Sequence, residues 1–285
     1  MCSAGVYLPP AHAARLGHRS MSAAAMPGST PQWLLLDVPG APGAAQLVQE
    51  QFAETRRFAL FEGTEFHGLR EQGPLLVDLQ QSPALAGLCH LDAGAWPGLL
   101  LVSASPAAQL LAHLRRMLTV TLGLHHKALL SYYNPHTASY FFDGCDPREL
   151  SCWLGPISLL RWFGGTWADR AIGSQGWQQL SNPGLPVSAL ETEHSLSDRQ
   201  RSQLQQCLLE RHAWRWSRST GQDYRLLWDD LQQGLALGFT ERAVLDDWLW
   251  LRLQYPKARP VPGLKGESQR ERLDHLRRLW QGDQG

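Results

Sequence analysis

The chain contains residue types that could carry hydrolytic chemistry, but their spacing does not fit it. A serine nucleophile on a strand-to-helix turn needs the pattern G-x-S-x-G, because only small residues fit the strained turn. The nearest segment, Val102-Ser103-Ala104-Ser105-Pro106, lacks both glycines. Ser105 before Pro106 is more typical of a helix start with Ser105 as its N-cap. No phosphate loop of the form G-x-x-x-x-G-K-[ST] occurs either. We therefore identify no catalytic residue.

Patterns for metal binding are also missing. His125 and His126 are adjacent, so their rings diverge on either a helix or a strand. The pair H-E-x-x-H does not occur, and no two cysteines have C-x-x-C spacing. The cysteines are Cys2, Cys89, Cys145, Cys152 and Cys207. We expect no metal ion and no cofactor, and an odd number of free thiols fits a reducing cytoplasm.

Charge and hydropathy argue against nucleic acid and membrane as partners. Lys+Arg and Asp+Glu both number 26, so the formal net charge is zero, whereas nucleic-acid binding usually requires a basic face. No apolar run approaches the roughly 20 residues of a membrane-spanning helix. We expect a cytoplasmic protein that binds neither.

Tryptophan is the residue type that stands out, with 12 in the chain. Trp214 and Trp216 lie two positions apart, as do Trp248 and Trp250. On a helix such residues point about 200° apart, so both members of a pair cannot enter one core stripe. Exposed tryptophan is enriched at binding hot spots. These four residues are our candidates for partner binding, although burial in the core is the ordinary role of tryptophan.

The elements that would position these residues change in type along the chain. Short apolar runs predict strands in the first part, with amphipathic helices between them, which favours an α/β lobe with a mainly buried sheet. The predicted strands are Trp33–Val38, Phe58–Phe61, Leu75–Leu79, Leu99–Val102, Leu129–Tyr133, Tyr140–Phe142 and Leu159–Phe163.

A cluster of proline and glycine, Ser181-Asn182-Pro183-Gly184-Leu185-Pro186, predicts a linker, and only helical patterns follow it. We expect an all-helical C-terminal lobe. The predicted segments are a disordered extension (1–31), the α/β lobe (32–181), the linker (182–195), the helical lobe (196–256) and a tail with a short helix (257–285).

Two central segments are similar to a known family. They read Leu114-Arg115-Arg116-Met117-Leu118-Thr119-Val120 and Leu129-Leu130-Ser131-Tyr132-Tyr133-Asn134-Pro135. Together with Gly73-Pro74-Leu75 before them and Leu154-Gly155-Pro156 after them, they resemble the effector chaperones, or adaptors, of type VI secretion. The resemblance spans roughly Trp33 to Pro256.

The resemblance implies an α/β lobe followed by a helical lobe. It also implies a non-catalytic role: binding one toxic effector in the cytoplasm and helping to load it onto a VgrG-type spike. Six motif residues become candidates for a structural or binding role: Arg115, Arg116, Tyr132, Tyr133, Asn134 and Pro135. We expect one of the two arginines to hold a carbonyl or carboxylate between Tyr132 and Asn134.

The chain departs from the family pattern at three positions. Ser131, Asn134 and His136 stand where arginine, aspartate and arginine are usual, so an ion pair or partner contact of the family would be altered here. Two other functions stay open: a hydrolase-like α/β enzyme with an unrecognised active site, and a regulatory protein-binding module unrelated to secretion.

Overall fold

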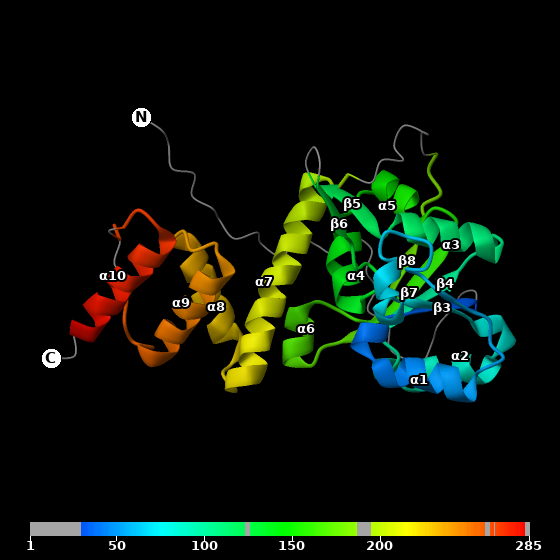
Figure 1. Cartoon of the computed structure of the whole chain (residues 1–285), viewed down its shortest axis with the longest axis horizontal. Coiled ribbons are helices and arrows are strands. Elements are labelled where there is room, and N and C mark those ends of the chain that lie inside the picture. The colour runs from blue at the N-terminus through cyan, green and yellow to red at the C-terminus, as the bar shows by residue number, and fades with distance from the viewer. Residues whose placement is uncertain (1–29, 123–125, 187–194, 260–262, 265, 283–285) are drawn as a thin grey trace. The chain divides into compact units, whose positions relative to one another are not determined.

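The computed structural model describes residues 30–122, 126–186, 195–259, 263–264 and 266–282 (Figure 1). The chain forms two compact units, Met1–Cys207 and Leu208–Gly285, and the division lies within the long helix α7 (Asp198–Thr220). The predicted boundary was the segment 182–195, of which residues 187–194 lie outside the described part. Each unit is treated by itself below.

The first unit is built on one six-stranded sheet in which all neighbouring strands are antiparallel. Its spatial order is β2 (Arg57–Ala59), β3 (Leu75–Asp78), β1 (Trp33–Leu36), β4 (Gly98–Val102), β7 (Leu159–Gly164) and β8 (Gly176–Ser181). A separate hairpin consists of β5 (Thr119–Leu122) and β6 (His126–Leu129).

Helices cover both faces of this sheet. Side chains alternate along a strand, so Leu34 and Leu36 of β1 face one layer and Leu35 faces the other. The first layer holds α1 (Pro42–Gln51) and α2 (Pro83–Leu91), and the second holds α3 (Ala107–Arg116), α4 (Pro135–Phe141) and α5 (Pro147–Leu154). The expected α/β lobe with a mainly buried sheet is confirmed.

The remaining elements are short. They are α6 (Trp167–Ile172) and the 3₁₀ helices η1 (Val38–Gly40), η2 (His67–Gln72), η3 (Leu79–Gln81), η4 (Ala93–Ala95) and η5 (Phe142–Gly144).

Two predicted strands are wrong, and one helix start explains both. The Asn134 side chain accepts hydrogen bonds from the backbone N–H groups of His136 and Thr137, so α4 begins at Pro135. Residues 140 and 141 therefore lie in this helix instead of a strand, and β6 already ends at Leu129. The Ser105 cap is also wrong, since Pro106 is the N-cap of α3 and no side chain caps it.

The second unit is helical, as expected. It contains the end of α7 with α8 (Tyr224–Ala236), α9 (Arg242–Gln254) and α10 (Gln269–Gly282). Its buried side chains include Leu227, Leu231, Trp248, Leu273, Leu276 and Trp280. The predicted tail helix is thus α10, which packs on α9. None of the helices in the described ranges is both long and apolar enough to cross a membrane.

The first turns of α7 belong to the first unit. Ser197 and Gln200 form reciprocal side-chain to backbone hydrogen bonds that start the helix. Leu204 packs against the large core cluster, and the Gln200 amide lies 3.1 Å from the Cys145 sulfur. These contacts explain why the division falls inside a helix and not before it.

Gly155 ends α5 under two constraints. Its φ of 49° lies in the region that favours glycine, and a Cβ there would lie 2.4 Å from the ring of buried His113. Gly173 also has a positive φ, 72°, but a Cβ there would meet nothing within 4 Å. Gly155 thus combines crowding with backbone strain, because its ψ of −112° lies outside the left-handed helical region that Gly173 occupies with a ψ of 22°.

We expect Gly155→Ala to lower the free energy of unfolding by about 1–3 kcal/mol more than Gly173→Ala, because it forces the His113 ring to move and strains the backbone more. Urea denaturation of both variants measures the difference. Equal losses would mean that the backbone at residue 155 relaxes without disturbing His113.

Candidate partner-binding site

Arg115 ties the end of α3 to the end of β2. Its Nε donates to the Leu60 carbonyl at 3.1 Å and its Nη2 to the Ala59 carbonyl at 3.3 Å. We expected an arginine of this motif to contact the segment from Tyr132 to Asn134. That target is wrong for Arg115, which instead binds the carbonyls of the last residue of β2 and of the residue after it.

Arg116 lies at one end of a chain of polar contacts. Its Nη2 lies 3.0 Å from Nδ1 of His113, whose Nε2 lies 2.9 Å from the Trp153 carbonyl oxygen. A guanidinium only donates, so Nδ1 accepts and Nε2 carries the hydrogen that bonds to the carbonyl. These two contacts fix the orientation of the His113 ring and connect α3 to α5.

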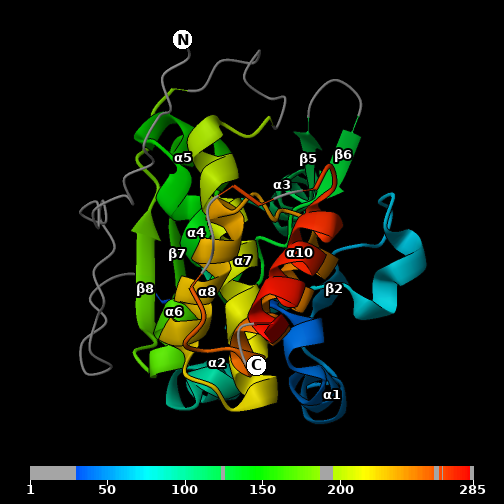
Figure 2. The ribbon, with the colours of Figure 1, turned by 90° about the vertical axis from the view of Figure 1, so that its left-hand side faces the viewer.

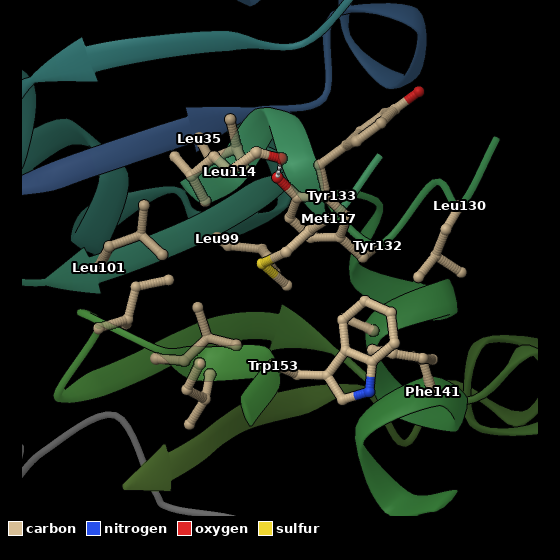
Figure 3. Close-up of a cluster of buried hydrophobic side chains, with 14 of the residues drawn as sticks. Leu35, Leu99, Leu101, Leu114, Met117, Leu130, Tyr132, Tyr133, Phe141 and Trp153 are labelled. Atoms are coloured by element: carbon tan, nitrogen blue, oxygen red, sulfur yellow. Dashed lines mark hydrogen bonds between the residues drawn. The ribbon is translucent and has the colours of Figure 1, made fainter. Parts of the chain in front are cut away.

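The two tyrosines of the second motif lie in a turn against the core (Figure 3). The Tyr132 hydroxyl donates to the Leu114 carbonyl at 2.8 Å, and burial raises its pKa well above the ordinary value. The Tyr133 ring meets Phe61 edge-on at 6.4 Å, and Figure 3 shows its hydroxyl directed away from the cluster. Burial raises the Tyr133 pKa too, a hydrogen bond with Ser131 opposes this shift, and the Asp37 charge adds to it.

Asn134 uses both ends of its amide. The oxygen caps α4, and Nδ2 donates to Oδ2 of Asp37 at 2.7 Å. Asp37 follows β1 and is buried. An aspartate at position 134, as the resembled family usually has, would bring a second carboxylate against the first. The amide is therefore matched to Asp37. Pro135, the first residue of α4, is also buried.

His136 has internal partners as well. Its ring lies over Trp167 with centroids 4.2 Å apart, and Nδ1 lies 2.9 Å from the Gly165 carbonyl oxygen. Nε2 lies 3.1 Å from Nη1 of Arg170, so it accepts and Nδ1 donates. Most motif residues thus contact the interior of the first unit, which favours the structural role over the binding role for them.

The tryptophan pairs in the second unit differ in burial. Trp248 is fully buried and donates to the Asp230 carbonyl at 2.6 Å, whereas Trp250 is 55% exposed. Trp214 and Trp216 are both half-buried. Trp216 meets Trp250 edge-on at 5.3 Å, which joins α7 and α9 at the surface. For the pair on α9, the expectation that one ring leaves the core is confirmed.

The tail covers Trp248. The Trp280 ring of α10 lies 5.8 Å from the Trp248 ring, and the Arg252 guanidinium lies 5.8 Å from each ring centre. Arg252 is itself held by Asp230 at 2.7 Å. The tail therefore completes the core of the second unit and leaves Trp250 exposed.

Polar groups surround the two surface rings. Asp246 accepts from the Trp216 indole at 2.7 Å, and its Oδ1 lies 3.1 Å from Nε2 of His212. Burial lowers the pKa of His212, and although Asp246 raises it, Arg242 and Arg215 lower it further.

Arg211, Arg215 and Arg242 are exposed. Desolvation lowers the Arg215 pKa, and the charges of Arg211 and Arg242 lower it further, so both lie near Arg215. We call Trp216, Trp250 and these three arginines the Trp–Arg strip. The tryptophans of the strip were predicted from the sequence, but its arginines were not. Their signal was the four-residue spacing that places Arg211 with Arg215 on one helix face, and Arg242 with Asp246 and Trp250 on another.

The described residues also bear on a possible metal or catalytic site. They contain no group of three or more His, Cys, Asp or Glu side chains that could hold a metal ion. An open pocket of about 290 Å³ beside β2 holds Arg57, Glu62, Arg70 and Glu71. Arg70 there pairs with the exposed Glu71 at 3.3 Å. Buried Ser103 donates to the Pro156 carbonyl, which is a structural contact.

Residues 32–152 match the model of a family described as a domain of unknown function (DUF4123). This span includes both motif segments and ends within α5. Neither the curated proteins nor the solved structures gave a match.

We expect Asn134→Asp to lower the free energy of unfolding by about 1–3 kcal/mol at pH 7, because it replaces a donor to buried Asp37 with a like charge. Repulsion raises the folded-state pKa of one carboxyl above its unfolded value near 3.9. The penalty is therefore full above that raised pKa and shrinks as pH falls through it. Denaturation at pH 7 and pH 4.5 tests this.

Asn134→Ser is the matched control, since it keeps a capping oxygen and adds no charge. A stability gap between Asn134→Asp and Asn134→Ser that stays constant with pH would show that the two carboxylates do not interact.

Proposed function

We propose that this protein is a non-catalytic adaptor that binds a type VI secretion effector in the cytoplasm and helps to load it onto a VgrG-type spike. The observation that carries the proposal is the family match at residues 32–152. It covers the same segments, Leu114 to Val120 and Leu129 to Pro135, on which the resemblance to effector chaperones rests. The proposal takes the function from that resemblance.

The surface chemistry supports a protein partner. Large rings that are half-exposed and already ordered are favourable anchors, because little side-chain entropy is lost on binding. Trp216 is held by Asp246 and Trp250 packs on Trp216. We place part of the effector contact on the Trp–Arg strip, with an apolar anchor over the rings and acidic side chains near the arginines.

The deciding experiment measures both binding of the effector and its secretion. We expect the protein to purify as a stable complex with the candidate effector encoded beside its gene. A clean deletion should stop secretion of that effector while the secretion machine still fires. Normal effector secretion from the deletion strain would end the adaptor proposal. Hydrolytic turnover by the purified protein would favour the enzyme alternative instead.

In that complex we expect Trp250→Ala to weaken effector binding by about 2 kcal/mol or more, as hot-spot residues do, and to lower the stability of the free protein by only about 0.5–1.5 kcal/mol, through the lost packing on Trp216. Trp250 is 55% exposed, so its loss opens little buried space. Calorimetric titration measures the affinity, and thermal unfolding measures stability.

Ile172→Ala is the matched control, because Ile172 is 56% exposed but lies on α6 of the first unit. Arg215→Glu should weaken binding most at low salt, since screening reduces its contribution at high salt. If Trp250→Ala and Ile172→Ala bind with equal affinity, the strip is not the effector site.

A further inference from the structure

The outer edge of β8 is an unusual feature of the first unit. β8 is the last strand in the sheet order, and Figure 2 shows it at the margin of the first unit's sheet, with β7 on its inner side. The opposite edge strand, β2, is only three residues long and begins with Arg57. Short length and charge are common protections against edge-to-edge pairing. β8 has six residues, Gly-Trp-Gln-Gln-Leu-Ser, with neither a charge nor a proline.

The register of β7 and β8 shows which backbone groups point outward. Leu159 lies opposite Ser181, and the Asn182 N–H donates to the Ser158 carbonyl at 2.9 Å. Residues 158 and 182 are therefore a hydrogen-bonded pair, and 159 and 181 are a non-hydrogen-bonded pair, because the two kinds alternate along antiparallel strands. By the same alternation, residues 176, 178 and 180 bond to β7. The N–H and C=O groups of Trp177, Gln179 and Ser181 therefore face away from the sheet.

We propose that β8 pairs with β8 of a second copy of this chain, which would join two six-stranded sheets into one. An antiparallel register centred on Gln179 places Trp177 opposite Ser181 of the partner copy and Gln179 opposite its equivalent. All three outward residues then exchange hydrogen bonds with outward residues, so the backbone groups of both edges are satisfied.

The side chains fit this register. Trp177, Gln179 and Ser181 share one face of the sheet, where directly opposed residues are close neighbours. The large Trp177 would face the small serine, so two bulky rings would not meet. The Trp177 ring is already packed on Phe163, with centroids 5.8 Å apart, which leaves the backbone edge clear of it.

Gln179 supplies a self-complementary polar contact. Its Oε1 accepts from Nε of buried Arg161 at 2.7 Å, so its NH₂ group is the end that is left to donate. The Oε1 atom has a second lone pair, so each NH₂ group can donate to the Oε1 atom of the facing amide across the two-fold axis. No charge on the strand opposes the approach of an identical edge. These features favour a second copy over an unrelated strand.

The test uses the full chain and its concentration dependence. Sedimentation velocity from about 5 to 300 µM should show a reversible monomer–dimer equilibrium, weak because a six-residue edge buries little area. Ser181→Pro removes one outward N–H from each copy and should weaken dimerisation about tenfold or more. Ser181→Ala keeps that N–H and should dimerise as the wild type does.

Amide hydrogen exchange gives a second measurement that needs no variant. The amides of Gln178 and Leu180 should be protected at every concentration, because they bond to β7. Those of Trp177, Gln179 and Ser181 should gain protection only as the dimer forms. A monomer across the whole range would overturn the proposal. So would a dimer in which these three amides exchange freely, or a monomer in which they are already protected.

Discussion

The first unit depends on one constraint, which is that the central strands of its sheet are buried on both faces. All four side chains of β1, Trp33 to Leu36, are buried. A strand of this kind needs an apolar layer on each side, and the alternation of side chains assigns α1 and α2 to one layer and α3 to α5 to the other. Any polar group near the sheet must then be paired, because an unpaired buried group is costly. Asp37 at the end of β1 meets this requirement through Asn134.

Several motif residues that make the chain resemble an adaptor family connect elements of the first unit by hydrogen bonds. Arg115 and Tyr132 both donate to backbone carbonyls, at Leu60 and Leu114. Carbonyls at the ends of elements lack a partner within the element, and here these two side chains supply it. A recognisable motif therefore fixes the fold of the first unit, while the most exposed aromatic pair lies in the second unit, outside the segment matched by the family model.

The sequence predicted the architecture better than the local elements. Strands that are buried on both faces form continuous apolar runs, so the runs alone predicted β1, β3, β4 and β7. The segment 129–142 was not, because Asn134-Pro135 resembles a turn between strands and also a capped helix start, and only the contact with Asp37 distinguishes the two. β8 was missed since its alternating Trp177 and Gln179 form no apolar run. The contact of the His113 side chain with the Trp153 carbonyl joins residues 40 positions apart in sequence, which no local pattern reveals.

Helix geometry limits what the second unit can expose, and tertiary contacts make the choice. Spacing alone shows that Trp248 and Trp250 cannot share one core stripe, but it does not say which is buried. The choice follows from α10, whose Trp280 lies against Trp248 with Arg252 beside both rings. Once position 248 faces α10, positions 242, 246 and 250 form the outward row, since residues four apart share a helix face. Arg242, Asp246 and Trp250 occupy that row. The aromatic ring, the indole acceptor and the guanidinium of the strip are therefore brought together by the same packing that closes the core.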